Sequence, residues 1–286
     1  MELLNPRNDF LFKRIFGSEE NQDLLVHFLN AVFEDAGEPL VTTVELLNPF
    51  LDKDAISDKQ SVLDIKARTE SGTIIDVEIQ LADHRDMAPR TLYYWAKLFE
   101  QQLTEGEHYR TLHKTVTINI LNFAYLPSPA YHTTFHLRED TTRALLTDLC
   151  EIHFVELPKL RTSEINLHHR LIRWMLFLTT QTSEQLEVLA MDDPVMKKAV
   201  TTLEFLSQDQ KIRELYLARQ KGLQTYAADM DAAREEGLQQ GLEQGAHTKA
   251  MEVARRLRRS GLSADQIQEA TGLSIGAIAA IMDEPE

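Results

Sequence analysis

Apolar and polar residues alternate along one stretch in the first third of the chain, 62–81, which reads VLDIKARTESGTIIDVEIQL. The run 62–69 and the run 74–81 both place apolar side chains at odd positions, as is typical of a strand with one apolar face. Between them, Glu70, Ser71 and Gly72 have the length of a three-residue hairpin loop, and glycine suits the left-handed conformation that closes it. The pattern therefore predicts a β-hairpin.

The loop of this hairpin also predicts its register. If Thr69 pairs with Thr73, the even-numbered residues of the two strands face each other on one side. The resulting pairs are Asp64 with Glu78, Lys66 with Asp76, and Val62 with Gln80.

Two carboxylates that face each other across paired strands repel, because their Cβ atoms are about 5 Å apart. A hard divalent cation such as Mg²⁺ takes oxygen ligands and cancels this repulsion, so Asp64 and Glu78 are candidate metal ligands. Gln80 points the same way and could orient a metal-bound water or a phosphate. The alternative is a solvated outer face with Lys66 and Asp76 as an ordinary ion pair, which the pattern alone favours.

Motifs around the hairpin resemble those of a nuclease superfamily. The spacing of Asp64 and Glu78-x-Gln80 is similar to the catalytic signature of PD-(D/E)XK nucleases, in the branch of recombination-promoting nucleases (Rpn) and nuclease family transposases. The order of further motifs makes this resemblance more specific than three residues alone. These motifs are Asn8-Asp9-Phe10-x-Phe12-Lys13, Phe16-Gly17, Leu29-Asn30, Leu47-Asn48-Pro49, Arg90-x3-Tyr94-Trp95, Gly106-Glu107-x-Tyr109 and Glu156-Leu157-Pro158-Lys159.

The resemblance implies a restriction-endonuclease-like α/β fold and a Mg²⁺-dependent DNA endonuclease, with Mn²⁺ able to substitute, in DNA recombination, mobile-element or defence processes. Asp64 and Glu78 would hold the metal together with a backbone carbonyl near Ile79. Gln80 replaces the lysine of the wider superfamily; because glutamine is no base, it is expected to position water or phosphate. Asp9 is a further catalytic candidate, because in the superfamily a helix before the catalytic strands often lends an acidic residue to the site. The alternative is that Asp9 only complements the dipole of its own helix.

Basic and aromatic side chains near the predicted site are candidate contacts to DNA phosphates. The segment 89–102 predicts a helix with Pro89 in its first turn. Arg90, Tyr94 and Lys97 lie close to one polar stripe of that helix, for which a solvated face is the alternative. The expected buried residues are Leu92, Trp95, Leu98 and Phe99. The candidate phosphate contacts are Lys13, Lys66, Arg90 and Tyr94.

Composition limits the class of protein. The 286 residues, 43% of them hydrophobic, can form one large core and a smaller module. No apolar run is long enough to span a bilayer and the start is not a signal peptide, so we expect a cytoplasmic protein. The single cysteine, Cys150, excludes an intramolecular disulfide. A net charge of -15 is unfavourable for DNA binding, so DNA contacts must come from a local basic patch or a bound cation.

Strand and helix patterns alternate up to about Lys159, and only helical patterns follow. We predict a nuclease-like α/β domain with a mixed sheet over 1–160, a helical extension over 161–226, and a helical tail over 227–286. Further strands are expected at 41–47, 115–123, 133–137 and 152–157. A turn-rich loop is expected at 48–59. Helices are expected at 8–33, broken at Gly17-Ser18, and at 167–178, 184–189, 195–206 and 212–217.

The tail combines glycines with a compact helical end. Gly237, Gly241 and Gly245 lie four apart, which indicates close helix packing or a flexible connector. Ser263 and Ser274 are expected helix caps around Gly272, after an arginine cluster at 255–259. The last helix, 275–282, has no side chain suited to reading a base. We therefore expect the C-terminal region to assemble homo-oligomers, with phosphate contact by the arginines as the alternative.

The histidines suggest no convincing metal set. His132 and His136 lie on a predicted strand, where residues four apart do not converge as on a helix. Partly exposed structural positions are expected for each of the ten histidines. Two alternatives to the nuclease remain: a catalytically inactive nuclease fold that binds DNA or protein, and an oligomeric scaffold built by the tail.

Overall fold

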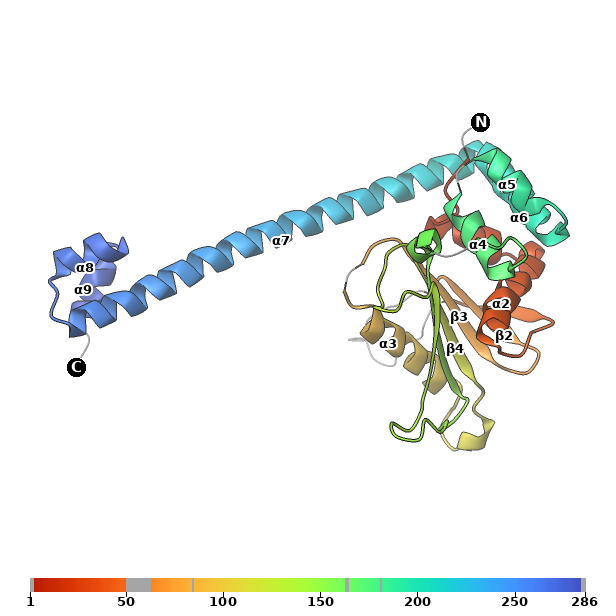
Figure 1. The fold of residues 1–286 in the computed structure, drawn as a ribbon, viewed down its shortest axis with the longest axis horizontal. Helices are drawn as coiled ribbons and strands as arrows, with labels where there is room; N and C mark the ends of the chain where they lie inside the picture. Colours follow the sequence, from red (N-terminus) through yellow and green to blue (C-terminus); the bar gives the residue numbers. More distant parts are fainter. Residues whose placement is uncertain (1–2, 50–62, 84, 163–164, 181, 284–286) are drawn as a thin grey trace. The chain divides into compact units, whose positions relative to one another are not determined.

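The computed structural model describes residues 3–49, 63–83, 85–162, 165–180 and 182–283. The chain divides into two compact units, Met1–Arg219 and Gln220–Glu286. In its described part, the first unit contains a six-stranded mixed sheet with helices on both faces (Figure 1). The predicted α/β fold, followed by helices alone, is confirmed.

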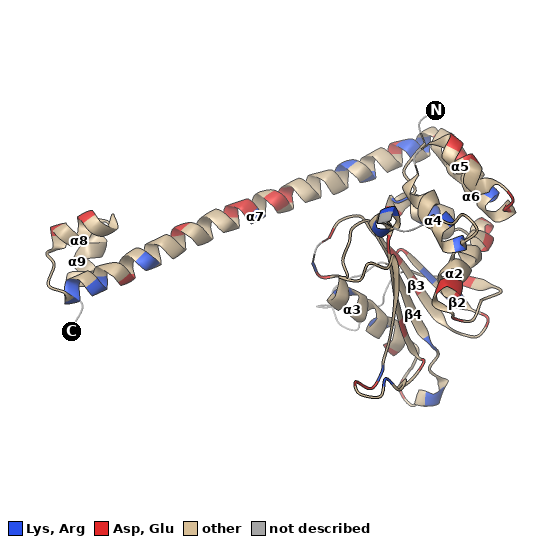
Figure 2. Cartoon of the chain, in the orientation of Figure 1, with Lys and Arg blue, Asp and Glu red and all other residues tan. Residues whose placement is uncertain are grey.

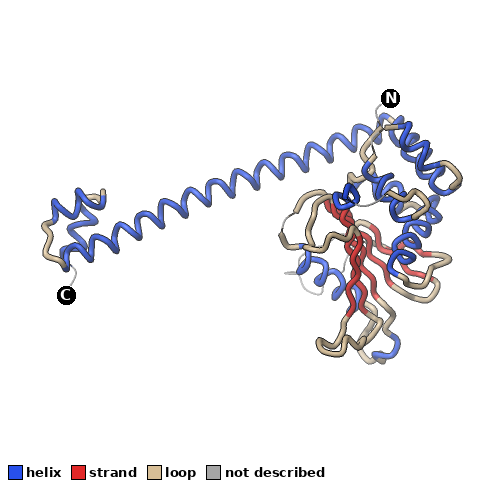
Figure 3. The backbone as a smooth tube through the Cα atoms, in the orientation of Figure 1, coloured by secondary structure: helices blue, strands red, loops and turns tan. Residues whose placement is uncertain are grey.

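The sheet has the strand order β1-β2-β3-β4-β6-β5, drawn in red in Figure 3. β3, β4 and β6 run parallel, whereas β1, β2 and β5 are antiparallel to their neighbours. The central parallel strands are buried on both sides, as expected for strands between layers of helices. The strands are β1 Val44–Leu47, β2 Ile65–Thr69, β3 Ile74–Gln80, β4 Thr115–Leu121, β5 His132–His136 and β6 Cys150–Glu156.

The predicted hairpin is confirmed together with its register. The Thr69 amide donates to the Thr73 carbonyl at 3.0 Å, and Lys66 pairs with Asp76. Gly72 has φ of +88°, and a Cβ there would lie 2.5 Å from the His113 ring, so only glycine fits. Val62 and most of the predicted loop 48–59 lie outside the described residues.

Most helices of the first unit pack on one face of the sheet and share one core with it. The odd-numbered residues of β2 and β3 contact this core, at whose centre Trp174 packs against the rings of Phe16 and Phe28. Part of the predicted helical extension therefore shares its core with the first helices of the chain; the proposed domain boundaries stay a prediction. The helices are α1 Asp9–Phe16, α2 Gln22–Ala36, α4 Arg170–Thr179, α5 Ser183–Ala190 and α6 Pro194–Gln208, with short 3-10 turns at Glu19–Asn21, Tyr109–Thr111 and Leu157–Thr162.

The opposite face is covered by α3, Met87–Glu100. Figure 1 shows α3 and α2 on opposite sides of the strands. Leu98 is buried as expected, but Leu92 is 53% exposed, so that prediction is wrong. Tyr94, placed on the polar stripe, is only 8% exposed, because its ring packs on Ile74 and Leu63 beneath the helix.

A long helix, α7 (Gln210–Arg259), follows the sheet domain. It is continuous through Gly237, Gly241 and Gly245, so these glycines form no irregular connector. Basic residues lie at its C-terminal end, where the ribbon is blue in Figure 2. In the described residues, no helix is long and apolar enough to cross a membrane.

The end of the chain forms a small helical module, as predicted. α8, Ala264–Thr271, begins with a capping box at Ser263 and ends at Gly272, whose φ is +66°. In α9, Ile275–Asp283, the Ser274 hydroxyl accepts from the Ala277 amide at 3.3 Å. Ala254 of α7 packs with apolar residues of the two short helices in a separate core.

Candidate active site

The two facing carboxylates of the hairpin come together. Asp64 lies directly before β2, and its amide donates to Oε1 of Glu78 at 3.0 Å. In return, the Ile79 amide donates to Oδ2 of Asp64 at 2.9 Å. Glu78 is 3% exposed. Because both carboxylates belong to paired strand ends, the sheet itself sets their separation.

Two cationic side chains from different helices reach these carboxylates. Lys13 Nζ of α1 lies 3.0 Å from Oδ1 of Asp64, and Arg90 Nη2 of α3 lies 3.4 Å from Oε2 of Glu78. The Arg90 guanidinium also lies over the Tyr94 ring, 5.3 Å from its centroid. Three of the four predicted phosphate contacts therefore lie around the carboxylates.

Gln80 joins the two sides of the site. Its Nε2 donates to Oε2 of Glu78 at 3.0 Å, and its Oε1 accepts from Nη1 of Arg90 at 3.2 Å. The amide thus holds an acidic and a basic side chain at once. The amide donates and accepts at the same time, whereas a lysine at this position could only donate.

Asp76 is a third carboxylate on the same strand face, and the sequence analysis treated it only as an ion-pair partner of Lys66. It is 1% exposed. Its Oδ1 has no hydrogen-bond partner in the described chain, and neither does the hydroxyl of Thr117, which pairs with Asp76 in the sheet. The signal that could have found Asp76 was its even position, which it shares with Asp64 and Glu78.

Burial raises the pKa values of all three carboxyl groups, and neighbouring carboxylates add to the effect. Burial, with repulsion from Asp64, raises the pKa of Glu78 to about 8. Burial also raises the pKa of Asp64, despite the nearby Lys13. The pKa of Asp76 lies well above its usual range because of burial and the charges of Glu78 and Asp64. Three carboxylates whose negative charge is incompletely balanced supply the oxygen ligands that a hard divalent cation prefers.

Asp9 lies at the start of α1, where Arg219 of α7 binds it. Arg219 Nε lies 3.1 and 3.0 Å from the two carboxylate oxygens of Asp9. The Asp9 charge contributes to the raised pKa of Asp64. Asp9 therefore belongs to the electrostatic surroundings of the site, with its carboxylate held by an arginine; its catalytic role stays a prediction.

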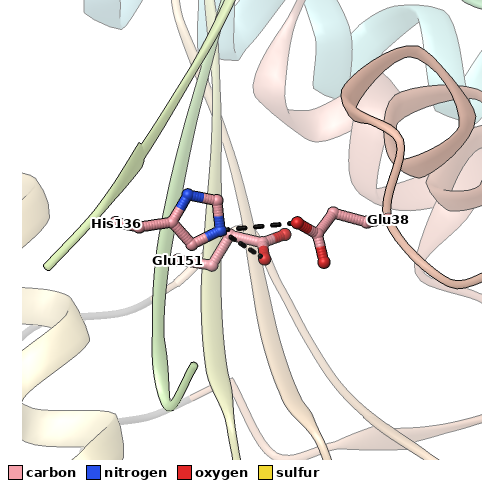
Figure 4. A group of neighbouring side chains, drawn as sticks. All are labelled: Glu38, His136 and Glu151. Atoms are coloured by element: carbon pink, nitrogen blue, oxygen red, sulfur yellow. Dashed lines mark hydrogen bonds and ion pairs between the residues drawn. The ribbon is translucent and has the colours of Figure 1, made fainter. Parts of the chain in front are cut away.

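A second polar cluster occupies the sheet edge formed by β5 and β6 (Figure 4). His136 Nε2 lies 3.4 Å from Oε1 of Glu38 and 3.2 Å from Oε2 of Glu151. These ligand atoms are close enough together to hold a metal ion. However, Lys114 Nζ already forms ion pairs with both carboxylates. The ammonium supplies the cation that the cluster needs, so we interpret the cluster as structural.

Two stacked histidines extend this cluster towards α2. His153 Nε2 lies 2.5 Å from Oε1 of Glu151, its Nδ1 lies 3.0 Å from Nε2 of His132, and Nδ1 of His132 lies 2.5 Å from Oδ2 of Asp35. The two rings therefore link the carboxylate of Glu151 on β6 to that of Asp35 on α2.

The expectation that the histidines are partly exposed is wrong for His132 and His153, whose side chains are buried. Among the described residues, His132 and His136 share no carboxylate partner, as expected. The sequence analysis missed the cluster because the pairing of β5 with β6 brings these residues together.

A mixed sheet that carries facing carboxylates on paired strands, between helices on both faces, is consistent with the restriction-endonuclease-like class of α/β fold. A family model described as PD-(D/E)XK nuclease family transposase matches residues 6–233, and the chain belongs to this family. Searches of curated proteins and of solved structures returned no significant match. Family membership indicates a nuclease- or transposition-related function and implies a DNA substrate.

Proposed function

We propose that this protein is a metal-dependent endodeoxyribonuclease that hydrolyses DNA phosphodiester bonds in recombination, mobile-element or defence processes. The observation that carries the proposal is the buried cluster of Asp64, Asp76 and Glu78, whose carboxyl pKa values are raised. A cluster whose charge is incompletely balanced destabilises the fold, and such clusters are typical of functional sites.

Asp64 and Glu78 would hold Mg²⁺, or Mn²⁺ in its place. When bound, the metal supplies a Lewis acid that activates water and stabilises the charge on the phosphate. Oδ1 of Asp76 is a further oxygen without a partner in the described structure, so the donor set fits a cation of this type.

The basic side chains would serve the phosphate. Lys13 and Arg90 neutralise the carboxylates in the structure described here. A cation on the carboxylates would release both side chains for charge-assisted hydrogen bonds to phosphate oxygens. The stacking of Arg90 on Tyr94 keeps the guanidinium at the site. Lys66 would add a third positive charge on this face.

Gln80 would position the attacking water or a phosphate oxygen. Because an amide does not accept a proton at neutral pH, the proton of the attacking water would go to solvent or to a carboxylate of the cluster. Asp9 would act on the site through its charge, with Arg219 as its counter-ion.

The proposal also covers the oligomeric state of the protein and its location in the cell. Met230, Leu238 and Leu242 of α7 are exposed apolar side chains, which supports homo-oligomer formation through the C-terminal helices. We further propose a cytoplasmic location.

The second candidate function is a catalytically inactive nuclease fold that binds DNA or protein as an oligomeric scaffold. The net charge of -15 and the ion pairs that occupy Asp64 and Glu78 favour this alternative. In that case the carboxylates would influence stability without any cleavage.

Nicking of supercoiled plasmid by the purified chain separates the two functions. The assay uses Mg²⁺, Mn²⁺ or a chelator, with Asp64→Asn and Glu78→Gln as test variants. Glu45→Gln is the matched control, because Glu45 is an exposed carboxylate on β1 of the same sheet. Metal-dependent nicking that disappears in both folded test variants and persists in the control is expected. The absence of nicking with either metal would support the scaffold.

A further inference from the structure

A hollow of about 660 Å³ lies between the start of the chain, the end of β4 and the α4–α5 region. Its polar lining includes Arg7, Asn122, Arg161, Thr182 and Gln185, and no carboxylate among the described residues lines it. The chain has 45 acidic and 30 basic residues. A hollow with two arginines and no described acidic side chain therefore runs against the overall charge of the protein.

The two arginines lie close enough for their charges to repel. Burial, together with the charge of Arg161, lowers the pKa of Arg7. Arg7 donates from Nη1 to Oδ1 of Asn122 at 2.5 Å and from Nε to Oδ1 of Asn5 at 3.2 Å, both neutral acceptors. Arg161 has no hydrogen bond or ion pair among the described residues. Neighbouring guanidinium groups of this kind are suited to bind an oxyanion.

Hydrogen bonds connect the hollow to the carboxylate site. The amide of Asn122 donates to the carbonyl of Gln80 at 2.9 Å, and the Gln80 side chain donates to Glu78. Arg7 immediately precedes Asn8, the residue that caps α1, and α1 also carries Lys13 of the site. The hollow therefore lies at the same end of β3 and β4 as Gln80 of the carboxylate site.

We propose that Arg7 and Arg161 bind a backbone phosphate of the DNA substrate that neighbours the phosphate to be cleaved. The inference rests on the proposed nuclease function. A DNA strand carries one charge per 3.4 Å of helix axis, so a strand at the carboxylates brings further phosphates nearby. Asn122 orients the Arg7 guanidinium, and Thr182 and Gln185 supply neutral donors for the remaining phosphate oxygens.

Binding of a fluorescent DNA duplex in the presence of chelator tests this site without requiring cleavage. The variants are Arg161→Gln and Arg7→Gln, with Arg7→Lys as a conservative change. Arg170→Gln is the matched control, because Arg170 belongs to α4 but pairs with Glu34. Arg161 is exposed, so its variant is expected to fold, which circular dichroism checks.

We expect Arg161→Gln and Arg7→Gln each to weaken binding about tenfold and to reduce the slope of log Kd against log salt by about 1. Arg7→Lys should keep the salt slope, and Arg170→Gln should change neither quantity. Unchanged affinity and slope in a folded Arg161→Gln variant would overturn the proposal. Inorganic phosphate that binds wild type in an arginine-dependent way without competing with DNA would assign the site to free phosphate and also overturn it.

The nicking assay distinguishes this failure from failure of the nuclease proposal. Arginine-dependent DNA binding without any metal-dependent nicking would retain the phosphate site and reject the nuclease. Nicking with unaltered binding in both arginine variants would retain the nuclease and reject the phosphate site.

Discussion

Two clusters of buried carboxylates lie on opposite faces of one sheet and have opposite electrostatics. Asp76 of β3 pairs with Thr117 of β4, and Glu151 of β6 pairs with the adjacent Val116, so their side chains point to different faces. On the α3 face, burial raises the pKa of Glu78 to about 8. On the α2 face, the pKa of Glu151 falls to about 2 because His153 and Lys114 outweigh the effect of burial.

The number and placement of counter-ions explain this difference. Glu151 has contacts with Lys114, His136 and His153. On the other face, Lys13 and Arg90 each contact one carboxylate, and Oδ1 of the third has no partner in the described chain. Buried charges that are paired within the protein need no further counter-ion, whereas charges left partly unbalanced can bind a cation. This contrast separates the structural cluster from the candidate active site.

The largest effect on stability is expected from Glu151→Ala. The change leaves Lys114 and the histidine pair without their buried carboxylate, which typically costs about 3–5 kcal/mol. Urea denaturation measures the free energy of unfolding, and Glu45→Ala on the exposed edge is the control. A loss below about 1 kcal/mol would mean that the cluster does not stabilise the fold.

Addition of Mg²⁺ should stabilise the protein through the other cluster. A ligand that binds only the native state, present at a concentration a hundred times its Kd, adds about 2.7 kcal/mol to the free energy of unfolding. Thermal denaturation should show this gain in wild type and in Glu38→Gln, but not in Asp64→Asn. If Glu38→Gln removed the gain and Asp64→Asn kept it, the metal site would belong to the histidine cluster.

Asp76→Asn should weaken Mg²⁺ binding by about tenfold, because residues that support metal ligands typically contribute 10- to 100-fold in affinity. Isothermal titration calorimetry measures the affinity directly. Glu139→Gln, in an exposed loop, is the matched control. Unchanged affinity in a folded Asp76→Asn protein would place Asp76 outside the metal site.

The two clusters should have opposite pH dependence in the metal-free protein. Glu78 binds its proton more tightly in the folded state, so stability should fall by about 1 kcal/mol per pH unit as pH rises from 4.5 towards 8. Glu151 binds its proton less tightly when folded, so its contribution is present above pH 4.5 and is lost as pH falls from 4.5 towards 2.

Urea titrations of wild type, Glu78→Gln and Glu151→Gln measure these slopes. Glu78→Gln should flatten the slope above pH 4.5, and Glu151→Gln should flatten the slope below it. The same slope above pH 4.5 in wild type and Glu78→Gln would show that this carboxyl is not buried with a raised pKa.

The sequence by itself determined the hairpin and the facing of Asp64 and Glu78. Both depend on local spacing, because a three-residue loop sets the register and alternation sets which side chains share a face. The helix caps at Ser263 and Gly272 were also predictable, since a cap depends on neighbours within one turn. The exposed position of Leu92 was not, because a helical stripe shows which residues share a face but not how far the neighbouring layer extends.

Only the tertiary structure decided how the charges are balanced. Arg90 reaches Glu78 from α3, and Lys13 reaches Asp64 from α1, because both helices pack against the same hairpin. His132 and Asp35 meet although 97 positions separate them. Burial and counter-ions depend on contacts between distant elements, and no local pattern encodes those contacts. The hairpin therefore showed where carboxylates face each other, and packing determined that their charge remains incompletely balanced.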